Sequence, residues 1–361
     1  MRSKGSQVHS QFNWLYILIV GGFFIILFFT MSTRQVDTVE RRISASALEG
    51  ISNIFEAART GTSMSATVNV PDLKIEFLCE SRLFGDNIYS EYRVGGFSRR
   101  MDGLPTFVPG DMEGDNLVTW TQTWELPIPV MNFLYIANSR TRFFFVRDES
   151  FSDIYSAIED SFSSNMRAEF VESEDPRFAD FNDLYSIIVV FTESTSEPTE
   201  LLEYVDETFS GFYRLVQVVP ESINFGRINI YEDMSHVGEM TYAGRASLYG
   251  AIFAPDESYY ECSMRKAIER LGRVACIHHH KHKALREHYS GDVQCRNVYD
   301  GVVESFYELF GDDFCRDTEG GIDLGDVSMS FEDNYEDIKR FYNSMEDAYG
   351  GARRFSCARP Y

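Results

Sequence analysis

Hydrophobic residues follow one another almost without interruption in residues 12–31 (FNWLYILIVGGFFIILFFTM), and no charged residue occurs among them. Twenty helical residues rise about 30 Å, which matches the hydrocarbon core of a bilayer. Trp14 and Tyr16 lie at one end of the run, where amphipathic rings favour the membrane interface. The pattern predicts a transmembrane helix over residues 12–31, preceded by a short cytoplasmic N-terminus over residues 1–11.

A secretory signal peptide is the main alternative to this anchor. Its apolar region is usually about 7–15 residues long and is followed by a small-x-small cleavage site. The run here is longer and ends in Phe-Phe-Thr-Met-Ser, with no such site directly after it. We therefore expect an uncleaved anchor, and a cleaved signal peptide or a pilin-type signal remains the alternative.

A single apolar stripe follows the predicted span. Hydrophobic residues recur there at steps of three and four, which is typical of one face of a helix. They are Val36, Val39, Ile43, Ala47, Ile51 and Ile54. We expect a helical stalk over residues 32–60 that packs on the body of the protein. The alternative is a weak coiled coil that joins copies of the chain into a homo-oligomer.

Residues 61–255 show the patterns of both strands and helices, and they predict an extracytoplasmic α/β (or α+β) sandwich. Residues 184–194 are a near-continuous apolar run, typical of a strand buried on both faces. A helix is predicted over residues 198–209 and another apolar strand over 212–221. This strand–helix–strand unit favours a parallel pair with a right-handed crossover. The apolar run 246–254 is predicted to be a further strand.

Two segments of this region allow a more specific interpretation. Residues 97–116 are rich in Gly, Pro and Asp and are predicted to be a loop. Residues 116–137 are strongly aromatic and contain Trp120, Trp124 and a Pro-Ile-Pro sequence. Burial of large aromatic side chains explains them best, and a partner-binding surface is the alternative.

Residues 256–361 are predicted to form a helical, cysteine-containing cap. Apolar stripes at helical spacing occur in residues 258–277, 298–310 and, more weakly, 334–349. We therefore expect the α/β sandwich to be followed by at least three helices.

All the cysteines lie beyond the predicted span, and their even number suggests disulfides in an oxidising compartment. They are Cys79, Cys262, Cys276, Cys295, Cys315 and Cys357. Cys262 and Cys276 lie on one predicted helix, about 21 Å apart along its axis. Bonded cysteines need Cα atoms within about 7 Å, so this pair is excluded if the helix is continuous. Cys295 and Cys315 flank another helical segment and meet the same objection. Each cysteine should bond to one on another element, and Cys79 can tie the first strand to the cap. The remaining connectivity stays open.

The orientation of the chain in the membrane depends on these cysteines. Arg2 and Lys4 precede the predicted span, and Arg34, Arg41 and Arg42 follow it, so the distribution of basic residues decides nothing. Disulfides place the bulk of the chain outside. The sequence thus predicts a single-pass protein of the cell membrane with a cytoplasmic N-terminus. Buried free thiols in a cytosolic domain are the alternative.

One dense group of metal-ligand residues occurs in the chain, at residues 276–282 (CIHHHKH). If this stretch is helical, His278 and His282 share a face at the spacing used by two-histidine metal sites. Cys276, His288 or an acid would supply a third ligand for a divalent metal. The alternative is an exposed polar stretch at a helix end or in a loop.

No nucleophile elbow, P-loop or dinucleotide fingerprint is present in the sequence, so no catalytic or cofactor-binding residue is assigned.

The net charge of the chain disfavours some classes of binding partner. The chain has 56 acidic residues against 33 Lys and Arg, a formal net charge of −23. Nucleic-acid binding is disfavoured, because no basic face is available to neutralise phosphates. A carboxylate surface of this kind suits concentrated salt, which screens the self-repulsion. The alternative is an acidic exterior domain that captures divalent ions or a basic partner.

Two resemblances to known families involve the N-terminal segment. The sequence MRSKGSQ, followed by a hydrophobic and then an amphipathic helix, resembles an archaeal type IV pilin-like N-terminus. That resemblance implies cleavage after Gly5 and assembly through the hydrophobic helix. The apolar run starts only at Phe12, however, and Ser10 stands where that family has Glu. QFNWLYILIVGG with the later GAIF and YYEC is similar to uncharacterised single-pass membrane proteins of small-genome archaea, which implies an anchored exterior domain.

These observations favour a membrane-anchored extracytoplasmic protein of cell-surface interaction or envelope assembly, and no catalytic activity is inferred. A pilin-like subunit of a surface filament or secretion system is the first alternative. A metal-dependent surface enzyme that uses His278 and His282 is the second.

Overall fold

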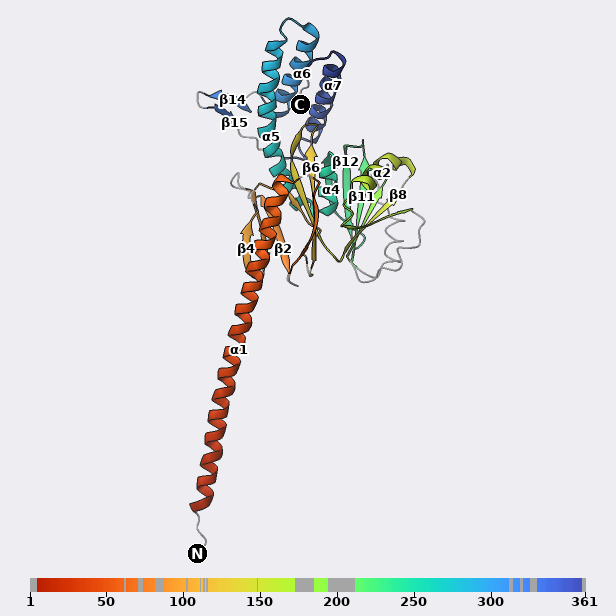
Figure 1. The fold of residues 1–361 in the computed structure, drawn as a ribbon. Helices are drawn as coiled ribbons and strands as arrows, with labels where there is room; N and C mark the ends of the chain where they lie inside the picture. The colour runs from red at the N-terminus through yellow and green to blue at the C-terminus, as the bar shows by residue number, and fades with distance from the viewer. Residues whose placement is uncertain are drawn as a thin grey trace.

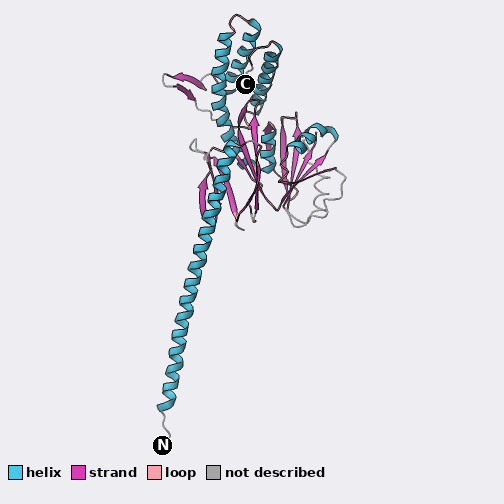
Figure 2. Cartoon of the chain, viewed as in Figure 1, coloured by secondary structure: helices cyan, strands magenta, loops and turns pink. Residues whose placement is uncertain are grey.

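The computed structural model contains a long N-terminal helix, a mixed α/β body and a helical C-terminal region (Figures 1 and 2). It describes residues 5–61, 63–70, 74–81, 88–101, 103–110, 112, 114, 116–147, 149–172, 185–193, 212–311, 314–318, 321–324 and 330–358. The C-terminus lies among the helices at the end of the molecule opposite the N-terminus (Figure 1). The predicted combination of an α/β body with a helical C-terminal region is confirmed.

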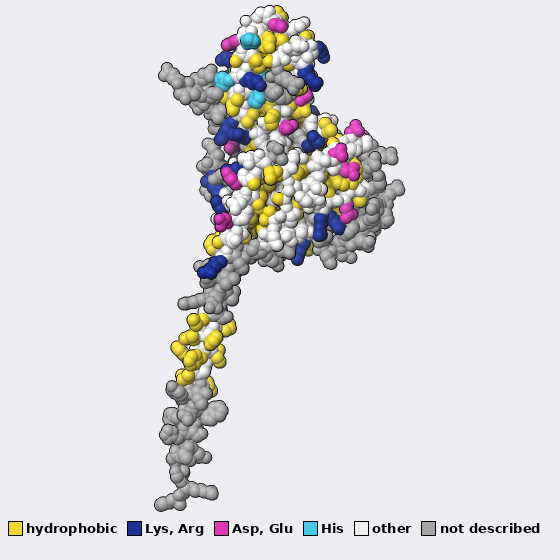
Figure 3. Space-filling model, viewed as in Figure 1, with side chains coloured by type: hydrophobic (Ala, Val, Ile, Leu, Met, Phe, Trp, Pro, Cys, Tyr) yellow, Lys and Arg dark blue, Asp and Glu magenta, His cyan; other side chains and the backbone are white. Residues whose placement is uncertain are grey.

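Helix α1 (Gly5–Thr60) is continuous over 56 residues and contains the predicted span and stalk. Hydrophobic side chains surround its described middle part, residues 18–31, and are exposed (yellow in Figure 3). The side chains of residues 12–17 lie outside the described ones. Judged on the described residues, none of the helices combines the length and the apolar character needed to cross a membrane.

The C-terminal part of α1 packs on the body. Ala47, Ile51, Phe55 and Ala58 are buried at three- and four-residue steps. The Phe55 ring stacks on the Tyr92 ring with centroids 5.4 Å apart, and the Tyr92 hydroxyl donates to the Leu48 carbonyl over 2.9 Å. The predicted packing of the stalk on the body is confirmed for this part. The side chains of the predicted stripe at positions 36, 39 and 43 lie outside the described ones.

Two mainly antiparallel sheets build the side of the body next to α1. One has the strand order β1-β6-β7-β5 and the other β2-β3-β4. Their bounds are β1 Ser65–Asn69, β2 Ile75–Ser81, β3 Ile88–Val94, β4 Phe97–Arg100, β5 Thr106–Phe107, β6 Asn116–Glu125 and β7 Pro129–Asn138. Within the first sheet, the short strand β5 pairs parallel with β7. Trp120 and Trp124 are buried, so the interpretation of these aromatic side chains as core residues is confirmed.

The predicted loop over residues 97–116 is wrong in part, because it contains β4 and β5. Gly95 and Gly96 have φ values of +53° and +82°, a region that favours glycine, and they turn the chain back so that β4 pairs with β3. Thr106 and Phe107 instead pair with β7, a strand distant in the sequence. The Gly, Pro and Asp residues of this segment therefore did not exclude strand pairing of the residues between them.

A six-stranded mixed sheet forms the other side of the body, with the order β13-β12-β11-β10-β8-β9. Its strands are β8 Thr141–Arg147, β9 Arg167–Glu172, β10 Tyr185–Phe191, β11 Tyr213–Pro220, β12 Phe225–Glu232 and β13 Ser235–Ala243, with η1 Glu149–Phe151 and α2 Ser152–Ser161 between β8 and β9. The predicted parallel pairing of β10 with β11 is confirmed. The predicted helix over residues 198–209, and with it the crossover, lies outside the described residues.

Helix α4 (Arg245–Phe253) corrects the predicted strand over residues 246–254. Residues 246–253 are all buried, and α4 packs on β6, β7 and β13. A helix enclosed on every side is hydrophobic all round and shows no 3.6-residue period. A short apolar run of this kind cannot be distinguished from a buried strand by periodicity.

The helical C-terminal region consists of α5 (Glu257–His288), α6 (Val293–Phe310) and α7 (Tyr335–Arg354), with a small hairpin of β14 (Cys315–Thr318) and β15 (Gly321–Leu324) beside α5. Asp256 and Asp292 cap the N-termini of α5 and α6 by accepting hydrogen bonds from backbone N–H groups. Because α5 continues to His288, the histidine-rich stretch is helical and does not form a loop.

All six cysteines form disulfides: Cys79–Cys262, Cys276–Cys315 and Cys295–Cys357. Each bond joins different elements, namely β2 to α5, α5 to β14, and α6 to the segment after α7. Neither of the two pairings that helix geometry excludes is formed, and Cys79 does tie an early strand to the cap.

Candidate functional site

A cavity of about 690 Å³ opens where the C-terminal end of α1, strands β4, β6 and β7, and helix α5 meet. Its charged lining consists of Arg59, Arg100, Lys266, Glu269, Arg270 and Arg273. Five cations against one carboxylate give the lining residues of this basic pocket a formal net charge of +4, in which Glu56, the ion-pair partner of Arg59, is not counted. The chain as a whole carries −23. The charge of the pocket is therefore opposite in sign to that of the whole chain, and the premise that no basic face is available is wrong for this part of the surface.

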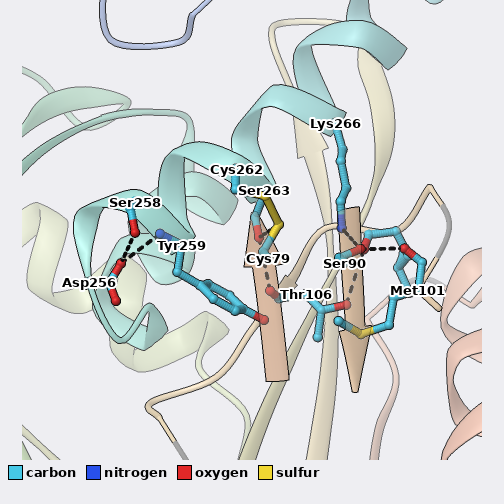
Figure 4. Close-up of a disulfide and its surroundings, with 11 residues drawn as sticks. Cys79, Ser90, Met101, Thr106, Asp256, Ser258, Tyr259, Cys262, Ser263 and Lys266 are labelled. Atoms are coloured by element: carbon cyan, nitrogen blue, oxygen red, sulfur yellow. Dashed lines mark hydrogen bonds between the residues drawn. A yellow bond between two sulfur atoms is a disulfide. The ribbon is translucent and has the colours of Figure 1, made fainter. Parts of the chain in front are cut away.

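Helix α5 contributes most of this charge. Lys266, Glu269, Arg270 and Arg273 are spaced by three, four and seven residues, so they lie on one face of the helix. Two contacts fix that face against the β sheets (Figure 4). The Cys79–Cys262 disulfide lies one helical turn before Lys266, and the Ser263 hydroxyl donates to the Thr106 carbonyl over 3.3 Å.

Lys266 is the most deeply placed of the five cations, with 8% of its surface exposed. Its Nζ donates to Ser90 Oγ over 2.6 Å, and Ser90 Oγ donates in turn to the Met101 carbonyl over 2.6 Å (Figure 4). The Ser90 hydroxyl thus donates its proton to the Met101 carbonyl and accepts a hydrogen bond from the Lys266 ammonium group.

The opposite wall is formed where α1 ends. Asn132 Nδ2 donates to the carbonyls of Ala58 and Gly61 over 3.2 and 2.9 Å, and Thr123 Oγ1 donates to Asn132 Oδ1 over 2.9 Å. These bonds satisfy carbonyls that the end of a helix leaves without intrahelical donors. They also place Arg59 at the rim, where it forms an exposed ion pair with Glu56 at 3.4 Å.

This lining suits binding of an anion. Arginine presents a planar fork of donors that matches carboxylate, phosphate and sulfate oxygens. A cleft lined by charge of one sign concentrates the electric field and attracts counter-ions. The volume lies in the range typical of small-molecule sites. The described lining includes no histidine or cysteine, and Glu269 is its single carboxylate.

The histidines predicted as metal ligands lie further along α5, where His278 follows Arg273, the last pocket residue of this helix, by a rise of about 7.5 Å. The His278 and His282 rings have centroids 6.0 Å apart, so the two residues do share a helix face. His282 is fully buried and stacks against Tyr299 and Phe306. The alternative of an exposed polar stretch is wrong for His279 and His282, which are both buried.

A different trio comes together near these histidines. Among the described residues, one group of three metal-ligand side chains has its ligand atoms within 4.8 Å of one another: Cys276, His280 and Cys315. Cys276 was among the candidate third ligands considered from the sequence. His280 and Cys315 were not, and only the tertiary structure brings Cys315 of β14 next to α5.

The basic pocket was missed at the sequence level. A signal was present, because residues 265–273 (RKAIERLGR) place basic side chains at helical spacing in a chain with few lysines. Arg59 and Arg100, however, come from segments distant in the sequence. No local pattern connects them with α5.

No protein-family model matches the chain, and no curated protein or solved structure is significantly similar to it. The resemblances to archaeal pilin-like N-termini and to archaeal single-pass membrane proteins therefore stay predictions.

Proposed function

We propose that this protein is a membrane-anchored extracytoplasmic binding protein whose basic pocket holds a multivalent anion. The observation that carries the proposal is the formal charge of +4 in a cavity of about 690 Å³ on a chain of net charge −23. No catalytic activity is included. This binding is the form of cell-surface interaction that the described residues support best.

Electrostatics favour an occupied pocket. Within a Debye length of about 8 Å at physiological salt, cations that line one cavity repel one another. An anion with several oxygens relieves this repulsion and accepts charge-assisted hydrogen bonds from more than one arginine. Phosphorylated, sulfated and polycarboxylated groups share this chemistry. Met101, Leu104 and Val130 also line the cavity and would contact an apolar part of the ligand.

The membrane anchor rests on the sequence of residues 12–31 and on the exposure of their described part. Phe28 and Leu18 are 74% and 73% exposed, and their neighbours along residues 18–31 are nearly all apolar. Water is an unfavourable solvent for a helix that is apolar on every side, and lipid is a favourable one. Three disulfides support an oxidising compartment for the body.

The length of α1 disfavours the lipid headgroups of the anchoring membrane as the source of the anion. Arg59 follows Met31 by 28 residues of continuous helix, a rise of about 42 Å. Lipid headgroups of the anchoring membrane would lie far below the pocket. The proposed ligand is therefore a soluble anion or an anionic group of the cell envelope.

Titration calorimetry on the full-length protein in detergent tests the binding, with inorganic tripolyphosphate and citrate as the probes. The Arg270→Ala/Arg273→Ala variant should bind at least one of them about 100-fold more weakly than the wild type. Each charge-assisted hydrogen bond contributes about 1.5–3 kcal/mol, and about 1.4 kcal/mol is a factor of ten. Lys281→Ala, an exposed cation elsewhere on α5, is the matched control and should bind normally. Wild-type protein that binds neither probe, or equal binding by the variant, would refute the proposal.

A pilin-like subunit is the second candidate, and the continuity of α1 favours it. An exposed apolar half and a docked half in one helix would let the first half assemble with other copies while the second carries the body. The non-reducing intact mass of protein extracted from its own membrane separates the two candidates. Full length with six hydrogens missing supports the uncleaved anchor, and loss of residues 1–5 supports the pilin-like subunit.

A further inference from the structure

Three side chains of residue types that bind metals lie together where helix α5 contacts strand β14. Cys276 and His280 are four residues apart on α5 and share a face of the helix. Cys315, the first residue of β14, lies over that face, and its Sγ is 3.1 Å from His280 Nε2. The three ligand atoms lie within 4.8 Å of one another, while the two sulfurs are joined in a disulfide.

We propose that reduction of the Cys276–Cys315 disulfide opens a binding site for one zinc ion. A dithiol reductant supplies two electrons and two protons, so that the disulfide becomes two thiols and the dithiol becomes a disulfide. Zinc then displaces both thiol protons and is bound by two thiolate sulfurs and the neutral His280 imidazole. A water molecule takes the fourth position. The oxidised form lacks the two thiolates and does not bind the ion.

The ligand set fits zinc on chemical grounds. Two thiolates and an imidazole are typical zinc ligands, at about 2.3 and 2.0–2.1 Å from the metal. Ligand atoms within 4.8 Å of one another need to move only slightly to reach a common centre. Thiolates and imidazole also disfavour calcium and magnesium, which prefer oxygen ligands.

The surroundings keep Cys315 in place without the disulfide. Phe314, the preceding residue, is buried, and its ring lies 5.2 Å from the Phe310 ring and 5.6 Å from the His279 ring. These contacts attach the start of β14 to α5 and α6. Cys276 is fully buried, whereas His280 and Cys315 are partly exposed. An ion therefore has access from one side of the cluster.

Competition with a chromogenic zinc chelator tests this inference on the full-length protein before and after phosphine reduction. The background for these measurements is Cys79→Ala/Cys262→Ala/Cys295→Ala/Cys357→Ala, which removes every other thiol. The reduced protein should bind one zinc ion, and the oxidised protein should bind at least tenfold more weakly. Cobalt in place of zinc should give thiolate-to-metal charge-transfer absorption.

His280→Ala isolates the contribution of the imidazole and should weaken zinc binding at least tenfold. His288→Ala, an exposed histidine of the same helix, is its control and should bind like the background. Equal affinity in His280→Ala, or equal affinity before and after reduction, would overturn the proposal. If the background does not fold, the same comparison is made in the wild-type chain. Reduced His280→Ala should then bind one zinc ion at least tenfold more weakly than reduced wild type, and equal affinity of every bound ion overturns the proposal.

Discussion

The Cys79–Cys262 disulfide should control both the stability of the body and the affinity of the basic pocket. It closes a loop with a sequence separation of 183 residues, whereas Cys295–Cys357 closes one of 62. The chain-entropy relation gives about 5 kcal/mol for the first loop and about 4 kcal/mol for the second. Measured losses for native disulfides are typically about 2–5 kcal/mol, so removing either bond should lower the free energy of unfolding by amounts of similar size.

The two bonds should differ in their effect on binding. Cys262 lies one turn before Lys266, and its partner Cys79 lies on β2, in the same sheet as Ser90. Without this bond, α5 can shift against that sheet, and the Nζ–Oγ contact of 2.6 Å between Lys266 and Ser90 is no longer fixed. We expect Cys79→Ala/Cys262→Ala to weaken binding of the active probe about tenfold, which corresponds to about 1.4 kcal/mol. Cys295→Ala/Cys357→Ala should leave that affinity unchanged.

Urea unfolding followed by tryptophan fluorescence measures the stability, because Trp120 and Trp124 are buried in the body. Calorimetry with the same probe measures the affinity of each folded variant. A stability loss below about 1 kcal/mol for Cys79→Ala/Cys262→Ala would contradict the entropic argument. Equal affinity losses in the two double variants would contradict the positioning argument.

Two further predictions concern the core and the pH dependence. A Cβ at Gly250 would lie 2.8 Å from the buried Phe107 ring, so Gly250→Ala should cost about 1–3 kcal/mol. Gly301→Ala, with open space around its Cβ, should instead stabilise by up to about 1 kcal/mol, and urea unfolding would reveal the wrong sign in either case. Burial raises the pKa of Glu332 above its ordinary value of 4.5, against hydrogen bonds from Thr241 that lower it. The contribution of Glu332 to the free energy of unfolding should therefore fall as the pH rises from 4.5 through the raised pKa. Glu332→Gln removes this contribution, and an unchanged slope of the free energy against pH in that variant would contradict the assignment.

Much of the secondary structure was predictable because its signals are local. The stripes of α5 and α6 and the apolar runs of β10 and β11 gave the correct element type. Prediction failed where an element has no period of its own or is created by a distant partner. Helix α4 is buried on all sides and shows no period. Strand β5 exists because it pairs with β7, about thirty residues further along the chain.

The candidate sites, too, were predictable from the sequence only in their local features. The spacing of His278 and His282 predicted a shared helix face correctly, but the sequence did not show that His282 would be enclosed by the rings of α6. Helix geometry excluded two cysteine pairings, and only the tertiary structure selected the three that form. The basic face of α5 could have been read from its spacing.

The sequence by itself determined the apolar N-terminal run, the acidic charge, the even set of cysteines and the order of most elements, because each depends on composition or on neighbours along the chain. The tertiary structure alone decided that Arg59, Arg100 and the basic face of α5 line one pocket, and that Cys315 meets Cys276 and His280. Such sites are formed by segments that come together only when burial of their apolar faces packs α1, the sheets and α5 against one another. No local pattern in the sequence predicts that these distant segments come together.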